Sequence, residues 1–264
     1  MKHYKLISSP ANNQFKQLKK LLQSAKSRRT YQQTLLDGPH LLTSLAQSEQ
    51  SPREIFIKEG AETTHAEIKH CLDLFPDIPV TQIKPALFDT ISPVDTPTGV
   101  IALYDIPTYH VDEYQFGILL EQVQDPGNLG SILRTVCAAG AQAVFLSKNC
   151  ADIWSPKSLR AGMGAHFQLK IYENADLFKH AQQFPSVVAT TLSAKQSLFD
   201  TNLTGKLAFV FGNEGSGISD ELLKLATQQV TIPMLGQTES LNVAAATAVC
   251  SFERVRQLKA MNHA

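Results

Sequence analysis

The sequence has few cysteines, and their arrangement suits neither a metal site nor a disulfide framework. Its four cysteines, Cys71, Cys137, Cys150 and Cys250, include no C-x-x-C pair. This spacing argues against a zinc ribbon and against a small fold held by disulfides. The eight histidines include no H-x-x-x-H pair, so we predict no metal centre. Scattered thiols are typical of a reducing compartment, and the expected location is the cytoplasm.

Long apolar runs are also missing. No run reaches the ~18 residues that a membrane-spanning helix needs. The first seven residues lack the apolar core of a signal peptide. Among the 264 residues, 43% are hydrophobic and 18% are charged, which is typical of a globular chain and not of a disordered one. We expect no contact with a membrane.

Acidic residues are absent from the first 36 positions, which hold eight of the 24 basic residues. The rest of the chain therefore has 16 basic and 24 acidic residues. This asymmetry favours a basic element that binds a polyanion. A solvated helix face with incidental lysines is the alternative.

Two α/β domains are predicted, covering residues 1–105 and 116–264 and joined by a polar linker at 106–115. Apolar and turn patterns predict these elements of the first domain: a helix starting near residue 13, helices 39–47 and 62–74, strands 54–58, 80–83 and 99–104, and a short helix or turn at 87–91. For the second domain they predict strands 116–121, 143–146, 184–189, 207–211 and 229–233, and helices 128–139, 155–162, 220–226 and 241–259. Continuous apolar strands alternating with helices indicate a parallel sheet covered on both faces.

Unusual residues follow three of the predicted strands, where ligands bind in open α/β sheets. The first segment, 121–134, contains a Pro-Gly turn, Asn128 as a candidate helix cap, and Arg134 farther along the helix. The second, 211–218, has three glycines but lacks the Lys-Ser/Thr of a P-loop and the G-x-G-x-x-G pattern. Its Glu214 suits a cationic or donor-rich ligand better than a phosphate. An ordinary cap and an ordinary turn are the alternatives for these two segments.

The third segment, 232–246, has Ser240 or Asn242 as a helix cap, followed by a run of alanines. Together the three segments read Pro-Gly-Asn-Leu-Gly-Ser-Ile-Leu-Arg, Phe-Gly-Asn-Glu-Gly-Ser-Gly-Ile and Ile-Pro-Met-x-Gly-x-x-x-Ser-Leu-Asn-Val-Ala. In this order they resemble the SpoU (TrmH-like) family of RNA ribose 2′-O-methyltransferases, over residues 117–259. Ala244 departs from the Ser or Thr that the family often has there.

The first half resembles the L30e-like substrate-binding domain that often precedes this catalytic domain. The resemblance rests on the basic start, on segment 36–42 and on the length. It implies a C-terminal SPOUT domain with a parallel sheet and a deep trefoil knot, and a homodimer. It also implies S-adenosylmethionine as methyl donor, bound in the knot loops. The residues at the matching motif positions are Gly212, Asn213, Ile232 and Leu241, with Thr190 and Leu192 as further candidates.

The resemblance also implies catalytic roles. Arg134 would lie at the reacting hydroxyl, either removing its proton through a phosphate relay or clamping the phosphate. Asn128 would orient the loop or bind the ribose. Glu214 would hold Arg134 or a backbone group. Ser240 and Asn242 would bind substrate or fix the knot loop.

RNA is the expected partner, and ribosomal RNA is favoured over transfer RNA because a separate substrate domain is present. The candidate phosphate contacts are Lys16, Lys19, Lys20, Arg28 and Arg29. A transfer RNA methyltransferase and a non-catalytic RNA-binding or assembly protein remain alternatives. A nucleotide-binding oxidoreductase is disfavoured because no G-x-G-x-x-G follows the first strand of the second domain.

Overall fold

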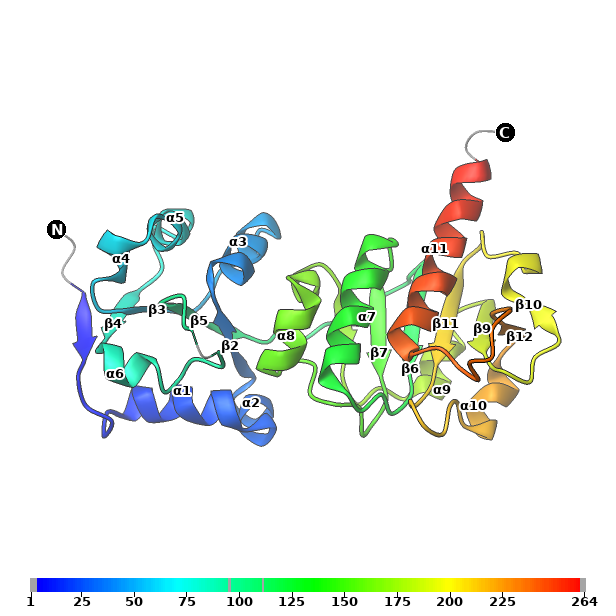
Figure 1. Ribbon diagram of the computed structural model, residues 1–264, viewed down its shortest axis with the longest axis horizontal. Coiled ribbons are helices and arrows are strands. Elements are labelled where there is room, and N and C mark those ends of the chain that lie inside the picture. The colour runs from blue at the N-terminus through cyan, green and yellow to red at the C-terminus, as the bar shows by residue number, and fades with distance from the viewer. Residues whose placement is uncertain (1–3, 95, 111, 262–264) are drawn as a thin grey trace. The chain divides into compact units, whose positions relative to one another are not determined.

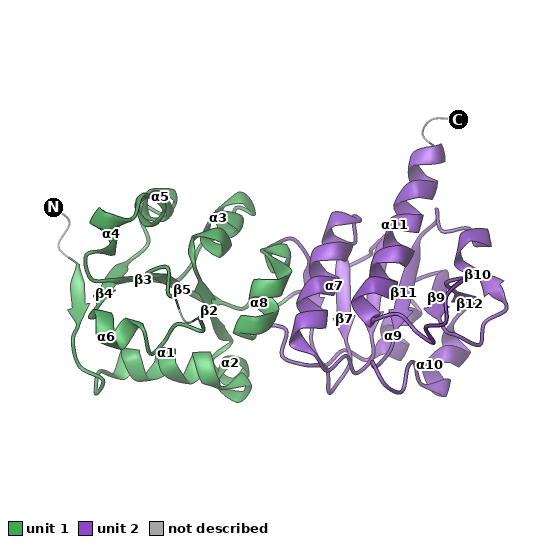
Figure 2. Cartoon of the chain, viewed as in Figure 1, with its two compact units in different colours: residues 1–108, 154–167 green, residues 109–153, 168–264 purple. Residues whose placement is uncertain are grey.

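The structure is a computed structural model that describes residues 4–94, 96–110 and 112–261. It forms two compact units, coloured separately in Figure 2. Unit 1 takes the chain up to Thr108 together with Trp154–Phe167, and unit 2 takes Tyr109–Ile153 and Gln168 onward. In the described part of the chain, no helix is both long enough and apolar enough to cross a membrane.

Unit 1 is a five-stranded mixed sheet in the order β1-β4-β3-β5-β2 (Figure 1). Strand β5 runs antiparallel to both of its neighbours, and β1, β4 and β3 are parallel. The elements are β1 Lys5–Ile7, α1 Asn13–Gln23, α2 Ala25–Tyr31, β2 Gln33–Asp37, α3 Pro39–Gln47, β3 Glu54–Lys58, α4 Ala61–Thr64, α5 Ala66–Leu74, β4 Val80–Ile83, α6 Pro85–Phe88, β5 Val100–Asp105, α8 Pro156–Gly162 and the 3₁₀ turn Ala165–Phe167.

Helix α1 covers one face of this sheet. Its N-cap is Asn12, whose side chain accepts from Phe15 N at 3.2 Å. Phe15, Leu18 and Leu21 are buried in a cluster with strand residues such as Phe56. Burying three large apolar side chains on one stripe stabilises the helix by several kcal/mol, at about 2 kcal/mol each. Its lysines are left on the solvent side.

The segment Trp154–Phe167 belongs to unit 1, whereas helix 155–162 was predicted in the second domain. Thr34 Oγ1 donates to the Trp154 carbonyl at 2.8 Å, and Gln50 Nε2 donates to the Phe167 carbonyl at 2.7 Å. The Tyr104 ring lies against Trp154 and Phe167, with centroids 6.1 and 5.4 Å away. The helix was predicted correctly, but helical periodicity does not say which sheet a helix covers.

The predicted helix 62–74 is interrupted. His65 adopts an extended conformation (φ −127°, ψ 109°) between α4 and α5. Thr63 Oγ1 donates to the Gly60 carbonyl at 2.8 Å, and Thr64 Oγ1 also donates to it at 3.3 Å. Both bonds return to Gly60, the N-cap of α4, and lie within its single turn.

Unit 2 is a seven-stranded sheet in the order β10-β12-β9-β11-β6-β7-β8, and every neighbouring pair is parallel. The predicted parallel sheet is therefore confirmed. Its elements are β6 Phe116–Leu120, α7 Pro126–Ala138, β7 Ala143–Leu146, β8 Lys170–Tyr172, α9 Leu177–Ala181, β9 Ser186–Thr190, β10 Gln196–Ser197, the 3₁₀ turn Leu198–Asp200, β11 Leu207–Phe211, α10 Asp220–Leu225, β12 Gln228–Thr231 and α11 Val243–Met261.

Helices cover both faces of this sheet. On one face, Leu177 and Ala181 of α9 and Leu222 of α10 share a buried cluster with strand residues such as Phe145 and Val210. Helices α7 and α11 pack against each other and lie together in front of the sheet in Figure 1. Since the strands are parallel, the loops after β6, β9, β11 and β12 meet at one edge of the sheet.

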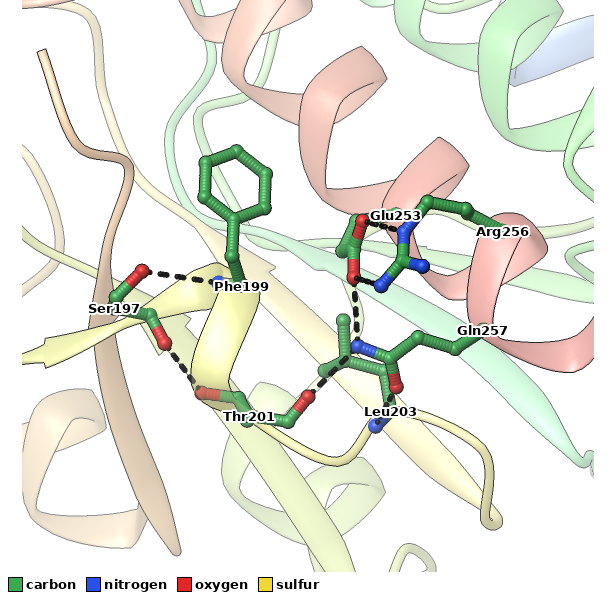
Figure 3. Close-up of polar contacts among 7 residues, drawn as sticks. All are labelled: Ser197, Phe199, Thr201, Leu203, Glu253, Arg256 and Gln257. Carbon is green, nitrogen blue, oxygen red and sulfur yellow. Dashed lines mark hydrogen bonds and ion pairs between the residues drawn. The ribbon is translucent and has the colours of Figure 1, made fainter. Parts of the chain in front are cut away.

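Gln257, which hydrogen-bonds the buried carboxylate of Glu253, anchors α11 to the segment after β10 (Figure 3). Glu253 accepts from Arg256 Nε and Nη2 and from Gln257 Nε2, each at 2.8 Å. Gln257 also donates to the Thr201 carbonyl at 2.9 Å and accepts from Leu203 N at 2.8 Å. The donation from Arg256 is the main reason why the pKa of Glu253 lies below its ordinary value. Glu253 is thus charged and fully partnered despite its burial.

Candidate active site

A cavity of about 730 Å³ lies in unit 2, beyond the carboxyl ends of β9, β11 and β12. Its walls come from the loops after these strands and from the start of α11. All six residues predicted to bind the cofactor line it: Thr190, Leu192, Gly212, Asn213, Ile232 and Leu241. Glu214, Ser240 and Asn242 line it as well. The structure therefore brings together residues that span more than fifty positions of the sequence.

The glycine-rich loop after β11 forms one wall, folded tightly on itself. Asn213 and Gly217 exchange backbone hydrogen bonds at 2.9 and 3.0 Å, and Gly217 has φ +72°. A Cβ on Gly212 would lie 2.1 Å from both the carbonyl carbon and the oxygen of Gly217. Only glycine fits at position 212, because the close backbone atoms cannot move away.

Glu214 joins this loop to the loop after β6. Its carboxylate accepts from Gln124 N at 3.1 Å, Asp125 N at 3.2 Å and Asn128 Nδ2 at 3.0 Å. Partial burial raises the pKa of Glu214, but these donors outweigh it and leave the pKa below its ordinary value. Of the two roles predicted for Glu214, the geometry supports holding backbone groups, and its contacts do not include Arg134.

Asn128 does not cap α7, and that prediction is wrong. The cap is Asp125, whose Oδ1 accepts from Asn128 N at 2.8 Å. Pro126 starts the helix two residues earlier than predicted, because its fixed φ and missing N–H suit the first helical position. The Asn128 side chain is therefore inside the first turn, where it donates to Glu214 and accepts from Asn242 Nδ2 at 3.1 Å.

Asn242 has two roles. Its Oδ1 caps α11 by accepting from Ala244 N at 2.9 Å and Ala245 N at 3.4 Å, as the sequence predicted. Its Nδ2 makes the bond to Asn128. The side chains of Glu214, Asn128 and Asn242 thus form one hydrogen-bonded chain across three motifs, which we call the Glu-Asn-Asn chain.

A second link between the loops was not predicted from the sequence. Glu121, at the end of β6, accepts from Ser219 N and Ser219 Oγ, each at 2.7 Å. Ser219 is the N-cap of α10, so this link fixes the far side of the glycine-rich loop. Asn213 Nδ2 adds a bond to the Gln122 carbonyl at 2.8 Å. An acidic residue directly after a buried apolar strand was the available signal.

Arg134 lies on α7, about two turns beyond its start, and its side chain is exposed. It does not line the cavity. Within the described residues its guanidinium makes no ion pair or hydrogen bond, so it is available to an external anion.

The basic face predicted for RNA lies in unit 1. Lys16, Lys19 and Lys20 on α1 and Arg29 on α2 are exposed. We call these four residues the basic face.

Arg28 was predicted to contact RNA, and that prediction is wrong. It is buried, with 5% of its surface exposed. Its Nη1 donates to the Leu21 carbonyl and, at 3.1 Å, to the Leu22 carbonyl. These are carbonyls of the last turn of α1, which lack partners within the helix. Arg28 therefore has a structural role, and the basic patch in the sequence contains one charge that is not on the surface.

Residues 115–252 match the SpoU rRNA Methylase family. The chain belongs to this family. Residues 12–102 match the MRM3-like substrate binding domain. The predictions of family and fold class are thereby confirmed.

Relatives match both halves of this SpoU family chain. It is 31% identical to the 23S rRNA (guanosine(2553)-2′-O)-methyltransferase RlmP of Bacillus subtilis, covering 93% of this chain and 97% of that one. It is 30% identical to the 23S rRNA (guanosine-2′-O-)-methyltransferase RlmB of Haemophilus ducreyi, covering 83% and 96%. The crystal structure of AdoMet-bound rRNA methyltransferase from Sinorhizobium meliloti superposes with a TM-score of 0.84 at 26% identity, covering 97% and 98%.

Proposed function

We propose that this SpoU family chain transfers the methyl group of S-adenosylmethionine to a ribose 2′-OH of ribosomal RNA. The observation that carries the proposal is the convergence of the six predicted cofactor residues on one cavity, next to the Glu-Asn-Asn chain. The names of the relatives in Bacillus and Haemophilus support ribosomal over transfer RNA.

The residues present fit S-adenosylmethionine. A cavity of about 730 Å³ admits a ligand of nucleoside size. The backbone of Gly212 is open to close approach, because no side chain is present there. Glu214 lines the cavity as an ionised carboxylate and would favour a sulfonium cation. When bound, the cofactor supplies a methyl group activated by that positive charge.

The protein must place the 2′-OH in line with the methyl group and help remove its proton. Arginine remains protonated in proteins, so we assign Arg134 to clamping the RNA phosphate beside the reacting ribose and stabilising the developing alkoxide. The 2′-OH proton would pass through that phosphate to water as the bond from the ribose oxygen to the methyl carbon forms and the bond from that carbon to sulfur breaks. The Glu-Asn-Asn chain would hold the loop before α7 in register with the cavity. Ser240 would hydrogen-bond the substrate at the cavity wall.

We further propose that the chain works as a homodimer in the cytoplasm. Unit 2 exposes several large apolar side chains, among them Phe199, Leu235 and Phe252, with exposed fractions of 50%, 104% and 48%. Burying such side chains against a second copy would stabilise a dimer. Sedimentation analysis of the chain and of Phe252→Glu tests this, and equal masses for the two would contradict an interface at α11.

The test of the activity uses unmodified ribosomal and transfer RNA transcripts, S-adenosylmethionine and nucleoside mass spectrometry. We expect one 2′-O-methylnucleoside in ribosomal RNA. Arg134→Ala should lose it while binding S-adenosylmethionine normally in calorimetry. Methylation of transfer RNA alone would establish the alternative substrate. Cofactor and RNA binding without methylation of either RNA would contradict the proposed enzyme.

A further inference from the structure

Unit 1 contains a second, smaller cavity, of about 90 Å³, between β2, α3, α8 and the loop before β5. Leu35, Leu41, Leu159 and Met163 supply apolar walls, while Asp37 and Arg160 supply opposite charges. None of these residues lines the cavity in unit 2. The space admits the edge of one planar ring and not a whole nucleotide.

Asp37 is the unusual group in this pocket. It ends β2 and is only partly exposed, yet in the described part of the chain its carboxylate accepts one hydrogen bond, a long one from Ser92 Oγ at 3.4 Å. Burial raises the pKa of Asp37 to about 6, against the lowering effects of Ser92 and the Arg160 charge. At neutral pH the group is therefore mostly ionised, with acceptor positions that the protein does not fill. A partly buried carboxylate left in this condition is a candidate for binding donors of a ligand.

Guanine fits these features better than the other bases. Its Watson–Crick edge presents two adjacent donors, N1–H and the N2 amino group, which pair with the two oxygens of a carboxylate. Adenine and cytosine each present one donor beside an acceptor, and uracil one donor between two acceptors. The apolar walls suit the faces of the ring, and the exposed Arg160 suits the attached phosphate.

We propose that this pocket binds the Watson–Crick edge of an unpaired guanine in the RNA substrate, with Asp37 as the acceptor. Unpaired bases are the usual targets of sequence-specific RNA recognition. The source is RNA and not a free nucleotide, because the same unit carries the basic face on α1 and α2. The inference rests on the proposed function only in assuming an RNA substrate.

The test is methyl NMR of the full chain, labelled at Leu and Met, with 5′-GMP, 5′-AMP, N1-methyl-GMP and inorganic phosphate as probes. We expect saturable shifts of Met163 and Leu159 with GMP, with affinity for AMP lower by about tenfold. N1-methyl-GMP should also bind more weakly than GMP, because the methyl group replaces the N1–H donor. Equal binding of GMP and AMP, or the same shifts with phosphate alone, would overturn the proposal.

Asp37→Asn is the decisive variant, because an amide offers one acceptor and one donor and cannot accept both guanine donors. It should bind GMP and AMP alike, whereas the surface control Asp77→Asn should keep the preference for GMP. Retained preference in Asp37→Asn would overturn the assignment. Arg160→Gln should weaken the binding of GMP and of AMP equally.

Two further measurements distinguish RNA from a free nucleotide as the ligand, and this pocket from the proposed function. A single-stranded oligonucleotide containing one guanine should displace GMP, and its failure to do so would overturn RNA as the ligand. S-adenosylmethionine added to the same sample should shift Met234 and Leu241 in the other cavity. Absence of those shifts would count against the proposed function, and absence of the GMP shifts would count only against this pocket.

Discussion

Asn242 Nδ2 lies 3.1 Å from Asn128 Oδ1, although the two residues are 114 positions apart in the chain. The bond ties the start of α11 to the first turn of α7. Because Asn128 also donates to Glu214, one side chain joins all three motif loops. We infer that the loops behave as one unit, and that a change in any of them alters the geometry of the others.

Asn242→Asp separates the two roles of this residue. Aspartate keeps the acceptor that caps α11 but lacks the donor to Asn128. We expect methyl transfer to fall on the order of 100-fold through misplacement of the substrate loop. The free energy of unfolding should change by less than about 1 kcal/mol. Single-turnover methylation and urea titration measure the two effects, and full activity would show that the cross-motif bond is dispensable.

Gly212→Ala should abolish cofactor binding. Its Cβ would overlap the backbone of Gly217, so the glycine-rich loop must open. Gly205→Ala is the control, because no heavy atom lies within 4 Å of its added Cβ and Gly205 does not line the cavity. Calorimetry with S-adenosylmethionine should give no binding heat for the first variant and normal affinity for the second. Equal affinities would show that the loop does not shape the site.

Arg28→Ala and Arg29→Ala form a neighbouring pair with opposite expected effects. Removing Arg28 leaves carbonyls of α1 without their donor and should lower the free energy of unfolding by about 2 kcal/mol. Removing the exposed Arg29 should leave stability unchanged but reduce the slope of RNA affinity against salt by about one unit. Urea titration and filter binding at several salt concentrations test the pair. The reverse pattern would contradict the assignment.

Asp37→Asn should stabilise unit 1 at neutral pH. The folded pKa of Asp37 is about 6, above its ordinary value of 3.8, so the native state binds the proton more tightly than the unfolded state. The stability of the natural chain therefore falls as pH rises from about 4 to about 6 and is level above that. Asparagine has no such penalty, so the variant should gain about 2 kcal/mol at pH 7.5, after allowance for partial exposure.

The advantage should shrink as the pH falls below about 6 and should vanish below about 3, where aspartate is protonated in both the folded and the unfolded state. Fluorescence of Trp154, the single tryptophan, reports unfolding because its ring is buried in unit 1. A gain that does not depend on pH would point to packing and not to the carboxylate charge.

The meeting of the motif loops could be predicted from the sequence. Each motif follows a strand of the sheet, and parallel strands bring their carboxyl ends to one edge. The residue that caps α7 was harder to predict, because Asp125 and Asn128 are both good capping residues. Pro126 decides for Asp125, since proline suits the first position of a helix.

Other features depended on tertiary contacts that periodicity does not encode. Lysines and arginines of the basic segment look equivalent in the sequence, yet Arg28 turns inward to the carbonyls of α1. The three-residue strands β1 and β8 are too short to show alternation. The trefoil knot implied by the resemblance stays a prediction.

The return of Trp154–Phe167 to unit 1 affects how this protein can be divided. The chain passes between the units after Thr108, after Ile153 and after Phe167. A protease cut in the linker at 106–115 would therefore divide unit 1 itself, and would leave Trp154–Phe167 attached to unit 2. An excised second half would carry Trp154 and Phe167 without the Tyr104 ring that they pack against. The two units are thus not interchangeable modules, because exchanging either half of the chain would also have to exchange part of the other unit.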